Sequence, residues 1–375
     1  MIPVGICGSH TIFRIHLNTR LRTMVDKRLR RATRKDVAQL AGVSDALVSY
    51  VMNKGPRPVA AGTRTRILEA IAELNYHPNV SARALRLQRT EVVGLIVPDI
   101  SNPFFSEFAK ALQDQCFTHG YALIVADSSY ESHSGKGVQV QALLERQVEG
   151  IIDYDVLLAE GSSLLADAHV RLVSMAYGVD GPRVNTVGID DYLASIEAVR
   201  HLASHGHKRI GYVSGPKNVP ISRVRYRGWR DALAELSLPN DKSLVVNTTI
   251  TRAGGAAGVQ DILMRPDAPT ALFVASDLQS MGALYGLHVM GLEVPNDVAL
   301  ISFDGSQETE FSVPPMSVVQ QPIVELARMA FRQLLDGASG HPPTRTIIPH
   351  SLVLRTSCGC HGVVPADSQK STFRE

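Results

Sequence analysis

Cysteine is scarce in this chain of 375 residues, which has only Cys7, Cys116, Cys358 and Cys360. Four scattered cysteines are too few for the disulfide framework of a small secreted protein. Cys358 and Cys360 are separated by one residue, and no second ligand pair lies at the spacing of a zinc finger. We therefore expect a reducing environment, no cofactor and no metal ion.

Long apolar runs are also absent, as is a secretion signal. The longest runs, such as Val92–Pro98 and Ala271–Ala275, are strand-sized, whereas a membrane helix needs about 20 apolar residues. Residues 1–31 lack the apolar centre and small-residue cleavage site of a signal peptide, because basic residues such as Arg14 interrupt them. We expect a cytoplasmic protein with a basic, disordered leader over residues 1–31, or a true start at Met24.

Acidic residues are scarce at one end only. Residues 1–90 contain 16 lysines and arginines against 5 acidic residues, while residues 91–375 contain 22 against 31. One end therefore carries a net charge of +11 and the remainder −9, a pattern that indicates a nucleic-acid-binding domain joined to a different one. The length and the 45% hydrophobic content predict two or three compact units.

Residues 32–78 have the pattern of a helix-turn-helix headpiece. A first helix is predicted to begin at Thr33, capped by the Thr33/Asp36 pair, and to end at Gly42. Ser44 then caps a second helix, and a short turn with glycine between two such helices is typical of the helix-turn-helix. An ordinary three-helix bundle has the same apolar pattern, but the positive charge favours DNA binding.

A third helix is predicted from Thr63 to Asn75, with its apolar face toward the first two. Residues 79–90 follow as a hinge, in which Asn79–Leu87 is amphipathic but too short to be a stable isolated helix. We expect this hinge to fold only conditionally, for instance on DNA.

Residues 91–360 alternate short apolar strands with helical stretches. This alternation predicts parallel sheets wrapped by helices, and the number of strands favours two sheets. The expected strands lie near Val92–Val97, Ala122–Ala126, Gly150–Ile152, Arg171–Ala176, Val187–Ile189, Arg209–Val213, Leu244–Val246, Ala271–Ala275 and Val298–Phe303. Ligands of such folds bind beyond the carboxyl ends of the strands. The candidate lining is Pro98–Phe105, Asp190, Ser214–Arg225, Ser276–Asp277 and Asp304.

Many short motifs in consistent order resemble the lactose-repressor (LacI/GalR) family of bacterial regulators over about residues 32–358. In the headpiece and hinge they include Asp36-Val37-Ala38, Ala41-Gly42-Val43-Ser44, Thr65-Arg66-Ile67, Leu74-Asn75-Tyr76 and Ala82-Arg83-Ala84-Leu85. In the core they include Asn102-Pro103-Phe104-Phe105, Gly206-His207-Lys208-Arg209, Gly228-Trp229, Ser302-Phe303-Asp304 and Leu354-Arg355-Thr356-Ser357.

The resemblance implies an all-α helix-turn-helix headpiece and an α/β core of two doubly wound parallel-sheet subdomains, like periplasmic binding proteins. It implies three crossovers between these subdomains, near 190, 306–318 and 338–345. A polar tail over residues 361–375 lacks the heptad of a tetramer, so the expected assembly is a homodimer on a palindromic operator.

Residue roles follow from the same resemblance and from side-chain chemistry. Asp45 at the start of the second helix can accept from cytosine and Ala46 can touch a thymine methyl, while Leu85 is the wedge expected in the minor groove. The full DNA-binding set is Thr33, Ser44, Asp45, Ala46, Ser49, Tyr50, Asn53, Arg83 and Leu85. The effector set is Phe104, Phe105, Asp190, Arg225, Ser276 and Asp304, where carboxylates, a guanidinium and aromatic rings suit a carbohydrate.

Alternatives remain at this point. No phosphate-binding or catalytic motif occurs, so a sugar-converting enzyme has only fold analogy behind it. A sugar-binding protein, an activator or a corepressor-dependent regulator also fits the core. His201, His205 and His207 are better explained as a helix end capped by Gly206 than as metal ligands, and Trp229 as a core residue.

Overall fold

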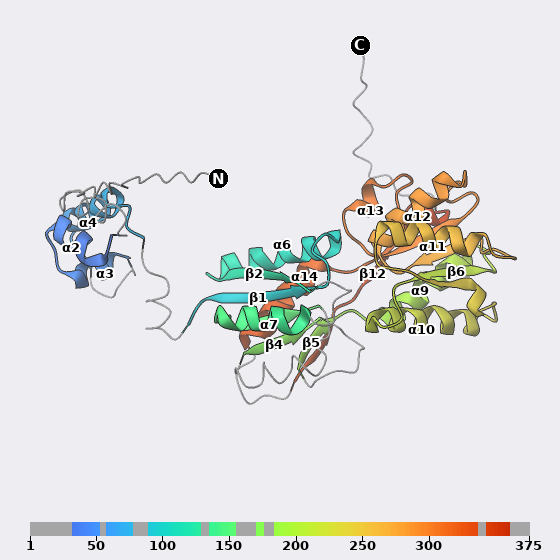
Figure 1. Ribbon diagram of the computed structural model, residues 1–375, viewed down its shortest axis with the longest axis horizontal. Coiled ribbons are helices and arrows are strands. Elements are labelled where there is room, and N and C mark those ends of the chain that lie inside the picture. The colour runs from blue at the N-terminus through green and yellow to red at the C-terminus, as the bar shows by residue number, and fades with distance from the viewer. Residues whose placement is uncertain are drawn as a thin grey trace, which may run out of the picture. The chain divides into compact units, whose positions relative to one another are not determined.

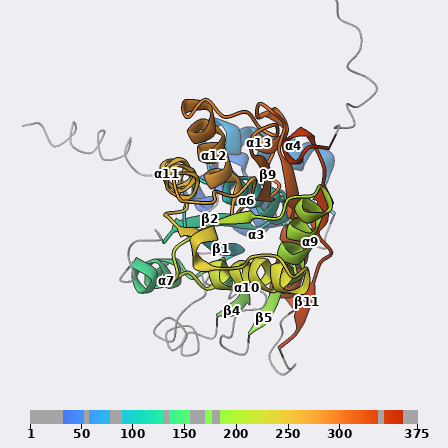
Figure 2. The same cartoon turned by 90° about the vertical axis from the view of Figure 1, so that its right-hand side faces the viewer.

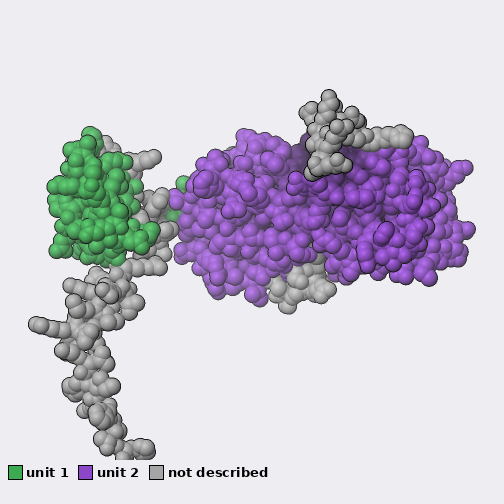
Figure 3. Space-filling model, turned by 90° about the horizontal axis from the view of Figure 1, so that it is seen from above, with its two compact units in different colours: residues 1–89 green, residues 90–375 purple. Residues whose placement is uncertain are grey.

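The computed structural model describes residues 32–52, 58–77, 89–128, 135–154, 170–175, 184–336 and 343–360. The chain divides into two compact units, residues 1–89 and residues 90–375, which Figure 3 colours separately. Among the described helices, none has the length and apolar content to cross a membrane.

The headpiece contains three helices, α2 (Arg34–Ala41), α3 (Asp45–Met52) and α4 (Ala61–Glu73). Thr33 caps α2 as predicted, because its side chain accepts from the Asp36 N–H while the Asp36 carboxylate accepts from the Thr33 N–H at 2.7 Å. Gly42 ends α2 with a left-handed φ of 63°, a conformation that glycine adopts without steric cost. Helix α4 begins two residues earlier than predicted.

One apolar cluster holds these three helices together. Val37 of α2, Val48 of α3 and Ile67 of α4 are each fully buried in it. Burying one such side chain contributes about 1.5–3 kcal/mol, so three mutually packed helices form a small core of their own.

The described part of residues 90–375 contains two six-stranded sheets. The first sheet has the order β11-β5-β4-β3-β1-β2 and the second β12-β10-β9-β8-β6-β7. The strands of the first are β1 (Val92–Val97), β2 (Ala122–Asp127), β3 (Gly150–Asp153), β4 (Arg171–Ser174), β5 (Asn185–Gly188) and β11 (Arg345–Ile347). Those of the second are β6 (Ile210–Ser214), β7 (Val245–Asn247), β8 (Ala271–Val274), β9 (Ala299–Asp304), β10 (Ser317–Gln320) and β12 (Ser351–Val353).

Helices cover both faces of each sheet (Figures 1 and 2). Around the first sheet lie α6 (Pro103–Thr118), α7 (Gly135–Glu145) and α14 (Ile323–Asp336). Around the second lie α9 (Asp191–Ser204), α10 (Pro220–Glu235), α11 (Arg252–Leu263), α12 (Asp277–Val289) and the short α13 (Glu308–Phe311). We call the first sheet with its helices the amino subdomain and the second the carboxyl subdomain.

The two subdomains share one strand order. In each, the first strand lies between the second and the third, and all pairs are parallel except that β12 runs antiparallel to β10. The order reverses between β1 and β3 in one sheet and between β6 and β8 in the other. Such switch points are where ligands of doubly wound sheets bind. The expected doubly wound, two-subdomain core is confirmed.

The chain passes between the subdomains three times. The first passage follows β5, at Ile189–Asp190, and leads into α9. The second lies at Gln321–Pro322, after β10, and not within 306–318 as expected. The third lies at residues 348–350, between β11 and β12, and not within 338–345. Both corrections have one cause: β10, β11 and β12 are only three or four residues long, and their apolar pattern is too brief to identify them.

The core of the carboxyl subdomain is built around stacked aromatic rings. Tyr212 stacks on Trp229 and on Phe273, with ring centroids 5.9 and 5.2 Å apart. Trp229, the chain's only tryptophan, is fully buried and donates from Nε1 to the Ile210 carbonyl at 3.1 Å. Trp229 is thus a core residue, as predicted.

Candidate functional site

Helix α3 carries the side chains predicted to meet DNA bases. Ala46 is exposed, while Ser49 and Tyr50 are half-buried on the same short helix. Ser44 is exposed just before the helix, and its Oγ accepts from the Leu47 N–H at 3.3 Å. Thr33 and Ser44 therefore act as helix caps in this structure.

Asp45 is paired within the headpiece. Its carboxylate accepts from Arg34 Nε at 2.8 Å and also from Arg34 Nη2, and both side chains are partly exposed. The hydrogen bond from Arg34 lowers the pKa of Asp45, which keeps the carboxylate charged. This pair joins the amino ends of α2 and α3, a contact that the sequence analysis did not foresee.

Three predicted DNA-binding residues lie outside the described residues, namely Asn53, Arg83 and Leu85. The same holds for the leader at 1–31, most of the hinge at 79–90 and the tail at 361–375. Their roles remain predictions.

A cavity of about 820 Å³, its open mouth included, lies between the two subdomains. The amino subdomain contributes Pro98, Asn102, Phe104, Phe105, Tyr154 and Met175. The carboxyl side contributes Asp191, Val219, Pro220, Ile221, Ser222, Arg225, Ile250, Ala275, Ser276, Asp304 and Gln321. Several of these residues follow strand ends, as the switch-point rule requires.

The amino side of the cavity is an aromatic wall. The ring of Tyr154 contacts Phe104, Phe105 and Phe108 edge to face, with centroids 4.7 to 5.6 Å apart. Asn102 caps α6 by accepting from the Phe104 N–H at 3.2 Å, which fixes the start of the helix that carries the rings. The Tyr154 hydroxyl is buried and has no hydrogen-bond partner among the described residues.

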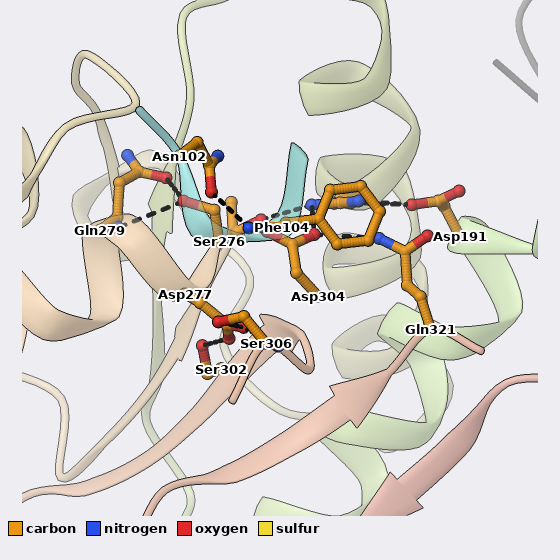
Figure 4. A network of polar contacts seen from close by, with 12 residues as sticks. Asn102, Phe104, Asp191, Ser276, Asp277, Gln279, Ser302, Asp304, Ser306 and Gln321 are labelled. Atoms are coloured by element: carbon orange, nitrogen blue, oxygen red, sulfur yellow. Dashed lines mark hydrogen bonds and ion pairs between the residues drawn. The ribbon is translucent and has the colours of Figure 1, made fainter. Parts of the chain in front are cut away.

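The carboxyl side is a charged wall centred on Arg225 of α10. Arg225 Nε donates to Asp191 Oδ1 at 2.8 Å, and Nη1 donates to the Ala275 carbonyl and lies 3.4 Å from Asp304 Oδ1. The guanidinium carbon lies 3.5 Å from the centre of the Phe303 ring. Asp191 at the start of α9, Asp304 at the end of β9 and Gln321 just after β10 form this wall (Figure 4).

Burial makes the carboxylates of this wall harder to ionise than exposed ones. Burial raises the pKa of Asp191, and it raises that of Asp304 to about 6 although the charge of Arg225 opposes the change. Asp304 also accepts from Gln321 Nε2 at 3.0 Å. Its φ of 115° is one that non-glycine residues rarely adopt, and such local strain is common at binding sites.

A third acidic group, Asp277, is fully buried outside the cavity lining. It accepts from the Ser302 hydroxyl and from both the N–H and the hydroxyl of Ser306, the N–H at 2.6 Å. Figure 4 shows this group as a separate cluster. Burial, together with the charge of Asp304, raises the pKa of Asp277 to about 8.

The structure corrects one predicted effector residue. Asp190 does not line the cavity, because its carboxylate accepts from the Leu193 N–H at 3.0 Å and caps α9. Its neighbour Asp191 lines the cavity and binds Arg225 instead. The cavity does include Phe104, Phe105, Arg225, Ser276 and Asp304.

Of two lining residues that were not predicted, Tyr154 had a usable signal in the sequence and Gln321 had none. Tyr154 follows a predicted strand by two residues, so it stands at a strand end like the others. Gln321 follows β10, which was not predicted, and so carried no such signal.

Comparison with known proteins agrees with this arrangement. The family model of bacterial regulatory proteins, lacI family, matches residues 33–79, and the model of a periplasmic binding protein-like domain matches residues 199–358. The chain is 32% identical over 311 residues to the HTH-type transcriptional repressor CytR of Escherichia coli (strain K12), covering 82% of this chain and 90% of CytR. The chain belongs to the lacI family.

Solved structures of lacI-family regulators share this fold. The transcriptional regulator CelR in complex with cellobiose has a TM-score of 0.65 and 30% identity, covering 87% of this chain and 100% of CelR. The Lac repressor dimer bound to operator and the anti-inducer ONPF has a TM-score of 0.77 at 24% identity, covering 88% and 99%. The chain is a lacI-family transcriptional regulator with a ligand-binding core, and not an enzyme.

Proposed function

We propose that the chain is a homodimeric repressor whose affinity for a palindromic operator is set by a carbohydrate in the cavity. The observation that carries the ligand class is the pairing of an aromatic wall with a charged wall across one cavity. Aromatic rings pack on the apolar face of a sugar ring, while carboxylates and a guanidinium hydrogen-bond its hydroxyls. The similarity to CelR, which was solved with cellobiose, points the same way.

Base reading is assigned to the exposed side of α3. The amino-terminal residues of such helices meet base edges in the major groove. A carboxylate has about four acceptor sites, so Asp45 can accept from cytosine N4 while it remains paired with Arg34. Ala46 is exposed beside it and can touch a thymine methyl. Tyr50 lies one helical turn further along.

The positions of the crossovers support a closure switch. Asp191 directly follows the first crossover and Gln321 lies within the second, so two cavity residues lie where the chain passes between the subdomains. The two subdomains also touch where Glu107 of the amino subdomain accepts from the Gln307 N–H of the carboxyl subdomain at 2.9 Å. A ligand that binds both walls favours one closure angle over another through its differential affinity for the two states. Residues 79–90, which include Arg83 and Leu85, then transmit the change in closure angle to the headpiece.

The ligand test is a thermal-shift screen of the full chain against saccharides and nucleosides. A ligand at 100 times its Kd stabilises the protein by about 2.7 kcal/mol. We expect a saccharide to give that shift and then to weaken binding to the operator, measured by fluorescence anisotropy. If a nucleoside stabilises the protein and no saccharide does, the proposed ligand class is wrong. If the ligand strengthens operator binding, it acts as a corepressor, and the proposal that it releases the protein from DNA is wrong.

The DNA test is selection of binding sites from random duplexes. We expect palindromic sites whose base preference changes when residues 45, 46 and 50 are exchanged together. The control is Glu69→Gln on the exposed face of α4, which should leave the preference unchanged. Unchanged sites after the triple exchange, or asymmetric single half-sites, would contradict the assignment.

A further inference from the structure

Two histidines and two cysteines meet at the carboxyl end of α9. The potential ligand atoms of His201, His205, Cys358 and Cys360 all lie within 4.8 Å of one another. His201 Nε2 lies 3.2 Å from His205 Nε2 and 3.3 Å from Cys358 Sγ. Cys360 Sγ lies 3.5 Å from His201 Nε2 and 3.4 Å from His205 Nε2. None of the four lines the effector cavity.

These four separations match four of the six edges of a zinc tetrahedron, and the two remaining ligand pairs lie within 4.8 Å. With zinc–nitrogen bonds of about 2.0–2.1 Å and zinc–sulfur bonds of about 2.3 Å, a regular tetrahedron has N···N edges of about 3.3 Å and N···S edges of about 3.5 Å. The four separations, 3.2 to 3.5 Å, agree with these values to within about 0.2 Å, so a central ion needs only a small adjustment of the remaining two pairs.

Hydrogen bonds alone do not explain the cluster. His201 Nε2 has three of the other ligand atoms within 3.5 Å. A ring nitrogen offers either one proton or one lone pair, so it can serve only one of these neighbours well. A single cation at the centre accepts one lone pair from each of the four groups and satisfies all of them.

The local fold explains how residues so far apart in sequence converge. His201 and His205 are four residues apart, which places both rings on one side of the same helical end. The antiparallel pairing of β12 with β10 returns the chain to this helix, where the short helix Thr356–Cys358 begins. Gly359 has a φ of 92°, and this left-handed turn lets both flanking thiols reach the imidazoles.

We propose that His201, His205, Cys358 and Cys360 bind one structural zinc ion. Two thiolates balance the charge of Zn²⁺, and a soft, tetrahedral S₂N₂ donor set favours zinc over calcium or magnesium. The Ser317 hydroxyl lies 3.0 Å from Cys358 Sγ and can donate to its thiolate, as outer partners of metal sites do. Cys358 is fully buried while His205 is exposed, so the ion has an approach from solvent.

Four protein ligands leave no open position, so the ion is structural and not catalytic. It fastens the segment after β12 to α9. The other end of α9 carries Asp191 of the effector cavity. The expectation of no metal ion was made because the cysteines have no second ligand pair near them and because His201 and His205 were interpreted as a helix end without a third ligand. The fold brings the two pairs together across the 157 residues between His201 and Cys358.

Metal content and cobalt spectroscopy test the site in the full chain. We expect about one zinc per chain after purification without chelator. After chelation and reduction, added Co²⁺ should give the visible bands of tetrahedral cobalt with a thiolate charge-transfer band. Absence of zinc together with a spectrum lacking these features overturns the proposal, as does a Cys358–Cys360 disulfide that persists under reducing conditions.

Matched variants locate the ligands. Cys360→Ser and His205→Gln change partly or fully exposed side chains, and each should weaken Co²⁺ binding by more than the roughly 10- to 100-fold that outer partners contribute. His207→Gln is the control, because His207 Nδ1 instead lies 2.9 Å from Thr270 Oγ1. Chelation should lower the thermal midpoint of the wild type and of His207→Gln, but not that of Cys360→Ser. Equal Co²⁺ affinity in all four proteins overturns the assignment.

Discussion

The amino and carboxyl subdomains share one strand order, yet they give the cavity opposite chemistry. The amino subdomain presents rings from Phe104, Phe105 and Tyr154, while the carboxyl subdomain presents Arg225 with its carboxylates. The shared order fixes where the walls lie, because residues at the switch point of each sheet face the cavity. The residues that follow each strand fix what the walls bind. Fold and specificity are therefore separable in this core.

The two walls also differ in what a ligand gains from them. The aromatic wall offers buried apolar area, which tolerates many ring-shaped ligands. The charged wall discriminates, because a ligand that fails to pair buried polar groups leaves them unsatisfied at a cost of about 1–3 kcal/mol each. Substitutions on the charged wall should therefore abolish the effect of the ligand on operator affinity, and substitutions on the aromatic wall should only weaken it.

The largest effect is expected for Arg225→Ala. Without the guanidinium, Asp191 and Asp304 lose their cation, and breaking such a buried pair costs about 3–5 kcal/mol. Arg225→Lys keeps a charge but loses the planar fork, so it separates binding from folding. We expect both variants to bind operator and to lose the ligand response, measured as the shift in operator affinity at saturating ligand. Arg200→Ala, which removes an exposed ion pair, is the control. A wild-type response in Arg225→Lys would show that the fork does not select the ligand.

This contrast between walls was only partly visible in the sequence. Apolar runs identified nine strands, and the capping residues identified the headpiece helices, since both signals are local. Asp190 and Asp191 illustrate the limit: two adjacent aspartates are equivalent by composition, and only the helix start decides that one caps α9 while the other faces Arg225. The pairing of Cys358 with His201 depends on the short strand β12, whose three residues carry no pattern.

A smaller effect is expected in the pH dependence of the carboxyl subdomain. The pKa of Asp277 rises from 3.8 to about 8, so the folded chain holds this proton more tightly than the unfolded chain. Its contribution to stability is fully present below about pH 4 and is lost as the pH rises through about 8, with a slope of about 1.4 kcal/mol per pH unit per proton. Asp277→Asn should flatten the decline between pH 6.5 and 8, above the pKa of about 6 of Asp304.

Trp229 makes this measurement specific. It is the only tryptophan and lies in the core of the carboxyl subdomain, so its fluorescence during urea unfolding reports on that unit. Asp261→Asn, at an exposed carboxylate of α11, should keep the wild-type slope. If Asp277→Asn and wild type decline equally between pH 6.5 and 8, Asp277 is ionised in the folded chain.

The smallest effect is expected on the aromatic wall, for Tyr154→Phe. The Tyr154 hydroxyl is buried without a partner among the described residues, so its removal breaks no hydrogen bond in the ligand-free protein and should leave stability unchanged or slightly higher. If a sugar hydroxyl satisfies it, the variant loses one neutral hydrogen bond of about 1 kcal/mol, which is roughly a fivefold weaker affinity. Titration calorimetry with the saccharide from the screen measures this change, and Tyr285→Phe, at an exposed tyrosine of α12, is the matched control. Unchanged affinity would place the sugar hydroxyls on the charged wall alone, and the aromatic wall would then serve only the apolar face of the ring.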